Sequence, residues 1–367
     1  MKQGWEIKKL GEVCESDLGK TLNQSKDTGE LRPYLCAVNV LWDKIDFTTL
    51  KETRFENAEL ERYTIKKGDL LICEGGDIGR AAIWNYDYEI QYQNALHRVR
   101  LDDSIRPRFL LLYLKHLKDS GVLDTRYGKG VTIKHLVKSS LLSIPIPVPP
   151  IKEQERIVAE LDCLSGIIER RREQLRELDA LAQSIFYQMF GDPITNEKGW
   201  VVKKWEEVFD TRTGKLNANV MNENGKYPFF TCSKDIFYID TYAFDCEALL
   251  LAGNNATANY DVKYYEGKFN AYQRTYVLTL KDDSLYKFFK FALENKLSLL
   301  QEQSIGGMTK YLTLGILHKI EFIVPPLTLQ QEFAEKIEAI ERQKELIKKS
   351  ISETETLFNA RMDYYFN

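Results

Sequence analysis

The fold is decided by a segment that the chain uses twice, IPIPVPPI at residues 144–151 and IEFIVPPL at residues 320–327. Each copy is a strand-like apolar run that stops at a Pro-Pro pair. A long charged helical stretch follows each pair. Proline interrupts a strand and suits the first turn of a helix. The pairs Pro149-Pro150 and Pro325-Pro326 therefore predict the same strand-to-helix junction in two places.

A second repeated segment marks the start of each half. GWEIKKLGEV at residues 4–13 returns as GWVVKKWEEV at residues 199–208. The period is too long for a solenoid, whose repeats run to roughly 20–50 residues. The chain is therefore predicted to hold one domain twice, each copy followed by a helix. Such an arrangement suits a protein that reads a target with two similar halves.

The length of 367 residues fits two to three domains, because domains usually hold roughly 100–200 residues. We predict globular domains at residues 1–148 and 193–324, with long helices at 149–192 and 325–367. The predicted class is α+β, with mixed α/β domains, because strand-like runs and one helix follow in the same order in both copies. The first copy has strands at 32–40, 68–73 and 95–101 and a helix at 109–117. The second has a strand at 227–232, a strand and then a polar turn within 248–255, a strand at 276–280 and a helix at 285–300.

The long helices carry apolar residues at alternating steps of four and three, which is the pattern of a coiled-coil seam. Each helix is about 50–60 Å long, and its apolar stripe needs a partner. The simplest partner of each long helix is the other long helix. We predict antiparallel pairing with pseudo-two-fold symmetry, because a parallel pair would force the second domain to run back along the first helix. The predicted pairing residues are Ile157, Leu161, Leu164, Ile168, Leu175, Leu178, Ile185 and Met189, with Phe333, Ile337, Ile340, Ile347, Ile351 and Phe358.

Composition sets limits on the class of protein. The net charge of −3 argues only weakly against DNA binding, because a basic face can coexist with acidic helices. The six cysteines form no C-x-x-C pair, so we expect reduced core residues in a cytoplasmic protein and no structural zinc site. The sequence shows neither a signal-peptide core nor a membrane-spanning apolar run.

Catalysis by this chain is not expected. An adenine methyltransferase would need an Asn/Asp-Pro-Pro-aromatic loop, whereas valine precedes both Pro-Pro pairs. The LGKT run at residues 18–21 resembles the end of a phosphate-binding loop, but Cys14 stands where its first glycine belongs. We therefore predict no catalytic residue, metal or cofactor. One set superficially resembles the carboxylates and lysine of a metal nuclease, but a polar hairpin loop is the favoured interpretation: Asp261, Glu266 and Lys268.

Polar and basic residues on loops are the candidates for DNA contact, because Arg pairs with guanine and Asn or Gln with adenine. The glycine-rich turn at residues 74–80 either lets the backbone approach DNA or simply connects two strands. His97 is either structural or a DNA contact. The candidates are Gly75, Gly76, Asp77, Gly79, Arg80, Gln91, Gln93, Asn94, Arg98, Lys129 and Lys134, with Gly253, Asn254, Asn255, Thr257, Gln273, Arg274 and Lys310 in the second copy. The lysines flank glycine loops and are expected to contact phosphates.

The whole pattern resembles the specificity (S) subunit of type I restriction–modification systems. The resemblance rests on the two repeated segments, on GDLLICEGGDIGR at residues 68–80, and on GKGVTIKHL at 128–136 with its partner IGGMTKYL at 305–312. It implies two target-recognition domains, each reading one half of a bipartite double-stranded DNA site. It further implies helices that set the spacer and dock two methyltransferase (M) subunits, and translocase–nuclease (R) subunits that join the complex.

The second copy departs from the glycine pattern, because residues 253–257 lack the Gly-Arg ending of the first turn. This suggests that the two halves read different sequences. Two other classes of protein stay open: a coiled-coil scaffold with protein-binding end domains, and part of a fused restriction enzyme. A steep salt dependence of DNA affinity would favour the specificity subunit over the scaffold.

Overall fold

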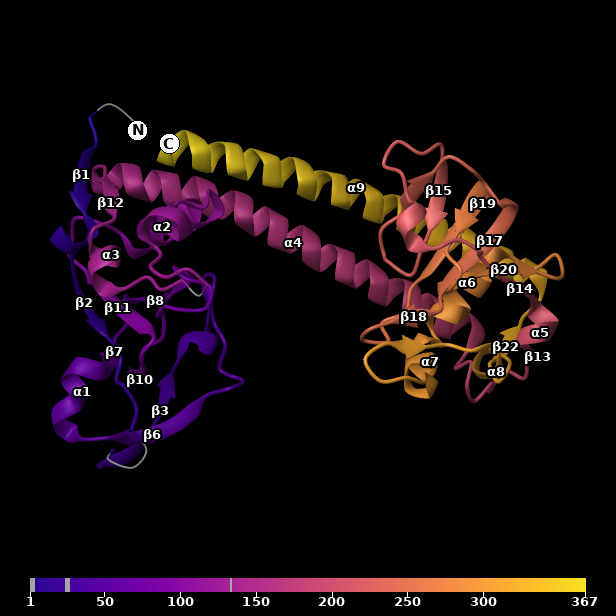
Figure 1. The fold of residues 1–367 in the computed structure, drawn as a ribbon, viewed down its shortest axis with the longest axis horizontal. Coiled ribbons are helices and arrows are strands. Elements are labelled where there is room, and N and C mark those ends of the chain that lie inside the picture. The colour runs from indigo at the N-terminus through magenta and orange to yellow at the C-terminus, as the bar shows by residue number, and fades with distance from the viewer. Residues whose placement is uncertain (1–3, 24–26, 133) are drawn as a thin grey trace. The chain divides into compact units, whose positions relative to one another are not determined.

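The computed structural model describes residues 4–23, 27–132 and 134–367 (Figure 1). Ile133, part of one glycine motif quoted above, lies outside the described residues. The chain divides into two compact units, one of residues 1–171 with 350–367 and one of residues 172–349. Each unit holds one mixed α/β domain together with parts of two long helices, α4 (Ile151–Phe190) and α9 (Leu327–Phe366).

The first domain is built on two four-stranded sheets, in the orders β6-β3-β10-β7 and β2-β11-β8-β9, with the pairs β1-β12 and β4-β5. Its helices are α1 (Asn57–Tyr63), α2 (Pro107–Asp119) and α3 (Lys138–Leu142). Its strands are β1 (Glu6–Lys9), β2 (Cys14–Leu18), β3 (Glu30–Leu35), β4 (Val40–Leu41), β5 (Lys44–Ile45), β6 (Lys51–Phe55), β7 (Thr64–Ile65), β8 (Leu70–Cys73), β9 (Ala81–Ile83), β10 (Ile90–Tyr92), β11 (Leu96–Leu101) and β12 (Pro145–Val148).

The second domain has a six-stranded sheet in the order β14-β20-β17-β19-β15-β16, with the pairs β13-β22 and β18-β21. Its helices are α5 (Trp205–Val208), α6 (Tyr286–Glu294), α7 (Leu297–Gln303) and α8 (Leu314–Leu317). Its strands are β13 (Val201–Lys204), β14 (Phe209–Thr213), β15 (Tyr227–Phe230), β16 (Phe237–Ile239), β17 (Phe244–Ala252), β18 (Asn254–Asn255), β19 (Val262–Ala271), β20 (Thr275–Leu280), β21 (Lys310–Tyr311) and β22 (Glu321–Val324).

Two of the predicted elements are wrong in extent. The strand predicted at 32–40 ends at Leu35, because the Asn39 side chain accepts a hydrogen bond from the backbone N–H of Cys36 at 3.0 Å and folds the chain into a turn. The helix predicted at 285–300 is two helices, α6 and α7. The break follows Glu294, where the N–H of Lys296 bonds to the carbonyl of Leu293, three residues back.

The two repeated segments meet each other within each domain. Strand β1 pairs antiparallel with β12, and β13 pairs in the same way with β22. The N–H of Leu10 donates to the Ile144 carbonyl at 2.9 Å, and that of Trp205 donates to the Ile320 carbonyl at 3.0 Å. The first strand of each half is thus hydrogen-bonded to the strand that directly precedes the long helix of the same half.

The long helices begin directly after their Pro-Pro pairs, as predicted. A buried glutamine fixes each start. Gln154 donates to the Pro149 carbonyl at 2.8 Å and accepts from the N–H of Arg106, just before α2. Gln330 repeats both contacts with the Pro325 carbonyl and the N–H of Leu285, before α6. Each long helix is therefore joined to its own domain through the hydrogen bonds of a buried glutamine.

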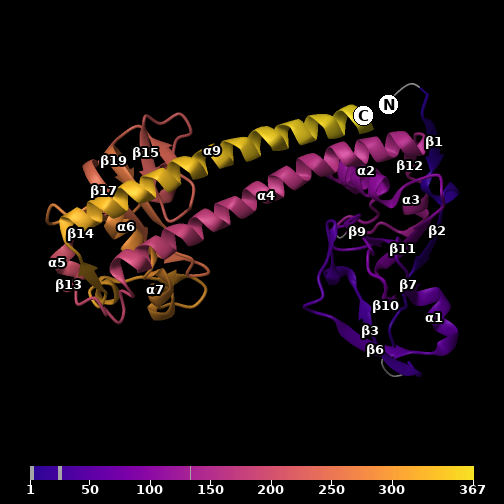
Figure 2. The same ribbon diagram turned by 180° about the vertical axis from the view of Figure 1, so that it is seen from behind.

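Within each unit the long helices run antiparallel (Figures 1 and 2). In the first unit, Tyr365 near the end of α9 donates to Glu160 near the start of α4 at 2.6 Å, and Arg361 forms an ion pair with the same carboxylate. Hydrogen bonds from Arg361 and Tyr365 lower the pKa of Glu160 to about 2. In the second unit, Lys344 of α9 pairs with Asp179 of α4.

The predicted pairing residues are all buried or half-buried. Near the ends of the helices, however, much of the apolar surface packs into the domain cores. Ile157 and Leu161 join the core of the first domain, and Phe333 and Ile337 join that of the second. Core residues that the heptad pattern did not single out are Phe186, Phe190, Met362, Tyr365 and Phe366.

Candidate DNA interface

Three loops of the first domain meet where β8 ends and β11 begins. The N–H of Glu74 bonds to the Ala95 carbonyl at 2.9 Å, and the N–H of Leu136 bonds to the Glu74 carbonyl at 2.7 Å. Lys129 and His135 exchange both backbone hydrogen bonds, which closes a hairpin. We call this group the first loop edge; it comprises residues 74–80, 93–95, 129–132 and 134–136.

The second domain repeats this arrangement contact by contact. The N–H of Gly253 bonds to the Arg274 carbonyl at 2.9 Å, and the N–H of Leu312 bonds to the Gly253 carbonyl at 2.9 Å. Ile305 and Tyr311 exchange both backbone hydrogen bonds. We call residues 253–257, 272–274 and 305–312 the second loop edge. Because the two loop edges share backbone contacts but not side chains, one scaffold carries two different surfaces.

Most of the predicted DNA contacts lie on these two loop edges. The first holds Gly75, Gly76, Asp77, Gly79, Arg80, Gln93, Asn94, Lys129 and Lys134, and the second holds Gly253, Asn254, Asn255, Thr257, Gln273, Arg274 and Lys310. Among them, Gly76, Asp77, Lys129, Thr257, Gln273 and Arg274 are exposed. The structure thus brings together residues from three separate parts of each half.

Gln91 and Arg98 no longer qualify as candidates for base contact, because both side chains are buried in the first domain and hydrogen-bonded there. Gln91 is 7% exposed and donates to the Thr64 hydroxyl at 3.3 Å. Arg98 is 4% exposed, and its guanidinium donates to Asp17 and to the Thr64 carbonyl, both at 2.9 Å. A buried guanidinium needs such acceptors. The sequence placed both residues near the loops but did not reveal which way they face.

Two members of the first loop edge also work inside the domain. Arg80 donates to the Ala37 carbonyl at 2.7 Å, and Asp77 forms an ion pair with Lys118 at 2.8 Å. Gly79 has a φ of +78°, and a Cβ there would lie 2.5 Å from a Leu123 methyl group. These contacts favour a structural role for the end of the glycine turn; Gly76 and Asp77 are its exposed part.

His97 and Tyr276 hold the hairpins to the sheets. His97 Nε2 lies 2.8 Å from the Leu136 carbonyl, and the Tyr276 hydroxyl donates to the Leu312 carbonyl at 2.9 Å. A carbonyl only accepts, so Nε2 carries the hydrogen. His97 is fully buried, and its Nδ1 has no hydrogen-bond partner among the described residues. Of the two interpretations of His97, the structural one is supported.

Acid is expected to weaken the first domain through His97. Burial lowers the pKa of this imidazole, so below about pH 6.5 the unfolded chain takes up a proton that the folded chain refuses. The free energy of unfolding should then fall as the pH falls, by up to about 1.4 kcal/mol per unit, until the folded pKa is reached. The free energies of unfolding of the protein and of His97→Gln, measured by denaturation and plotted against pH, should converge as the pH falls from 7.5 to 5. Parallel curves would contradict the assignment.

Other candidate sites are satisfied internally. The Lys20 ammonium, which resembled a phosphate-binding lysine, bonds to Glu59 at 2.7 Å and to the Arg54 carbonyl at 2.9 Å. Lys268 lies 3.9 Å from Asp245 on the adjacent strand, which fits the polar hairpin and not a nuclease site. Within residues 4–23, 27–132 and 134–367, no cluster of His, Cys, Asp and Glu could hold a metal ion. In the same ranges, no helix is long and apolar enough to span a membrane.

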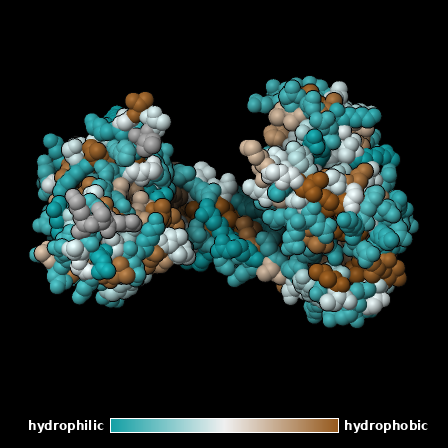
Figure 3. All heavy atoms as spheres, turned by 60° about the horizontal axis from the view of Figure 1, so that its bottom comes forward, coloured by the Kyte–Doolittle hydropathy of each residue, from teal (hydrophilic) through white to brown (hydrophobic). Residues whose placement is uncertain are grey.

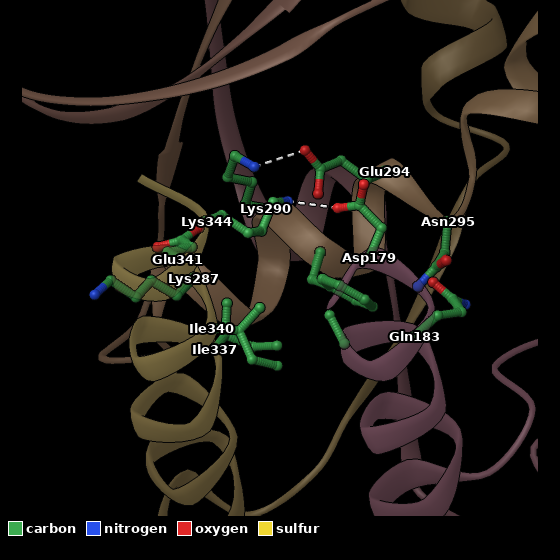
Figure 4. Close-up of a pocket in the computed structure, with 12 residues that line it drawn as sticks. Asp179, Gln183, Lys287, Lys290, Glu294, Asn295, Ile337, Ile340, Glu341 and Lys344 are labelled. Carbon is green, nitrogen blue, oxygen red and sulfur yellow. Dashed lines mark hydrogen bonds and ion pairs between the residues drawn. The ribbon is translucent and has the colours of Figure 1, made fainter. Parts of the chain in front are cut away.

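A hollow of about 400 Å³ lies in the second unit between α4, α6 and α9 (Figure 4). Its lysines are already paired with carboxylates. Lys290 bonds to Glu294 at 2.6 Å, Lys344 pairs with Asp179, and Lys287 pairs with Glu338. Because these charges satisfy one another, the hollow is a junction between helices and not a site for an anion.

Comparison with known proteins identifies the family. The model of the type I restriction modification DNA specificity domain matches residues 2–178 and again residues 197–356. The EcoDI specificity subunit of Escherichia coli is 36% identical over 152 residues, which cover 41% of this chain and 33% of that protein. The MjaIX specificity subunit of Methanocaldococcus jannaschii is 23% identical over 90% of this chain and 85% of its own length.

Solved structures show the same fold. The S subunit of a type I restriction–modification system from M. genitalium has a TM-score of 0.60 at 16% identity, covering 98% of this chain and 95% of that one. A chain from a study of the assembly of a type I system has a TM-score of 0.58 at 19% identity and covers 100% of this chain and 98% of its own. The family model covers most of the chain in two copies, one on each domain, so this protein belongs to the type I restriction–modification DNA specificity family.

Proposed function

We propose that this chain is the sequence-specific DNA-recognition subunit of a type I restriction–modification complex. Each domain reads one half of a bipartite double-stranded target through its loop edge. The observation that carries the proposal is that one loop edge is built twice, on the two segments that match the specificity-domain model. The shared backbone and the differing side chains fit two readers of two different half-sites.

The chemistry of the loop edges suits duplex DNA. Lys129 and Lys134 in the first domain and Lys310 in the second supply positive charge for phosphates. Gln93 and Asn94, and Gln273 and Arg274, supply the amide and guanidinium groups that read adenine and guanine. Gln273 and Arg274 are exposed, and the Arg274 guanidinium lies 5.1 Å from the centre of the Tyr311 ring, which holds it over the hairpin.

The partners follow from the class of complex. We infer that two methyltransferase subunits dock on the long helices and that the helices set the spacer between the half-sites. The restriction translocase–nuclease subunits join this assembly. These other chains would then catalyse methyl transfer and cleavage, while this chain recognises the target sequence. The relatives named above are specificity subunits, and one structural relative comes from a study of complex assembly in a type I system.

Lysines of the loop edges should contribute to the salt dependence of DNA binding. Each phosphate contact releases about one counterion, so removing one reduces the slope of log affinity against log salt by about 1. Lys129→Ala and Lys310→Ala should each show this reduction in the complex with the methyltransferase subunits on target duplex. Lys51→Ala is the control, because Lys51 is an exposed lysine of β6 outside both loop edges and both long helices. Slopes equal to the control for both variants would contradict the proposed interface.

A further inference from the structure

Each loop edge ends in a hairpin tip with a fully exposed apolar side chain. Val131 is 98% exposed and Met308 is 95% exposed. Exposure of an apolar side chain to water is unfavourable, and burying it fully contributes about 1.5–3 kcal/mol. Figure 3 shows a mainly hydrophilic face on which apolar residues lie in scattered patches.

The two tips are presented by equivalent frames. Gly130 and Gly306 occupy the same place in their hairpins and have φ values of +107° and +113°. The hairpins close through the Lys129–His135 and Ile305–Tyr311 pairs and are tied to the sheets through the leucine that follows. The tips differ in sequence, since Val131 corresponds in position to Gly307, and Met308 stands one residue later. Among the described residues, each half nevertheless presents a fully exposed apolar side chain at the tip, Val131 in one and Met308 in the other.

The surroundings of the tips suit a polyanion with an apolar interior. Lys129 and Lys134 flank Val131, and Lys310 follows Met308 with Arg274 on the adjoining loop. A surface for a protein partner would instead be expected to form a broader apolar patch. Duplex DNA offers phosphates on the outside and stacked bases within, and architectural proteins insert Leu, Ile, Met or Phe side chains between its base steps.

We propose that Val131 and Met308 are wedges, each inserted between base pairs of the half-site that its domain reads. This inference rests on the proposed function and deepens it. A wedge unstacks one base step, at a cost of a few kcal/mol that is repaid by closer contact. Methyltransferases act on a base that has left the stack. An opened step beside the target base would therefore make its extrusion by a docked methyltransferase easier.

The test uses the complex with its methyltransferase subunits and a target duplex that carries 2-aminopurine at the proposed step. Binding of the protein should raise the fluorescence, because the base becomes unstacked. Val131→Ser and Met308→Ser should each remove the rise in one half-site and lower affinity for the intact duplex roughly tenfold. For these serine variants, a mismatch at the same step of the duplex should restore most of the lost affinity, because a mismatched step is already partly unstacked. Val131→Ile and Met308→Leu should behave as the parent protein.

Ile194→Ser is the matched control, because Ile194 is 80% exposed and apolar but lies outside both loop edges. If the parent complex binds its target while Val131→Ser and Met308→Ser bind and fluoresce like it, the wedge is refuted and the proposed function stands. If these variants lose the methyltransferase subunits instead, the tips are protein contacts and the wedge is also refuted. If the parent complex binds no DNA specifically, the proposed function itself fails.

Discussion

Replacing Gly214 with alanine should destabilise the second domain by roughly 3 kcal/mol or more, because overpacking against backbone leaves little room for relief. The added Cβ would lie 1.8 Å from the carbonyl oxygen of Ala271. That backbone cannot easily move, since Ala271 pairs with Phe230 of β15 and the N–H of Tyr272 bonds to the Phe230 carbonyl. Chemical denaturation would measure the loss.

The same substitution should also harm DNA binding, because the loop with Gln273 and Arg274 leaves β19 at this point. Gly315→Ala is the control, since Gly315 lies outside the loop edge and a Cβ there would meet only the Thr313 hydroxyl oxygen, at 3.9 Å. Equal stability of the two variants would contradict the packing argument. Gly19 is the counterpart in the first domain, where a Cβ would lie 2.3 Å from the carbonyl carbon of Gln93.

Replacing Phe186 with alanine should cost about 3–5 kcal/mol, the usual range for deleting a buried phenylalanine side chain. Phe186 is fully buried in α4. Its ring centre lies 5.2 Å from that of Phe291 in α6 and 5.6 Å from that of Phe333 in α9. The side chain therefore joins three helices of the second unit, and its loss leaves a cavity among them.

Leu181→Ala, at a 48% exposed position of α4, is the matched control for Phe186. It should change the free energy of unfolding by less than about 1 kcal/mol. A Phe186→Ala variant no less stable than the Leu181→Ala variant would show that the α4–α6–α9 junction is not the apolar core described here. Thermal unfolding followed by circular dichroism would decide between these results.

The junctions of the fold could be predicted from the sequence because their signals are local and occur twice. A Pro-Pro pair limits backbone geometry whatever surrounds it, so the starts of α4 and α9 were predicted correctly. Gly191, with a φ of +73°, follows the last residue of α4, within two residues of the predicted end at 192. The strand β8 and the glycine turn after it follow from a short apolar run and its glycines in the same way.

What could not be predicted depends on tertiary contacts. The break between α6 and α7 is hidden because apolar residues keep a helical spacing across it, from Leu293 to Leu297 and Leu300. Arg98 and Gln93 look alike in sequence as polar residues near a loop, yet only the fold shows that Arg98 is buried. The equivalence of His97 and Tyr276 could not be predicted for the same reason, since two unlike side chains each bond to the carbonyl of the leucine after a hairpin.

We propose that this chain determines which DNA sequence a methyltransferase complex modifies. The most direct measurement is methylome sequencing of a host that carries this chain with its methyltransferase subunit, against a host with the methyltransferase subunit alone. We expect a bipartite, asymmetric modified motif that is present only with this chain. A stable complex of the two proteins that produces no new motif would contradict this proposal and would favour a protein-binding scaffold.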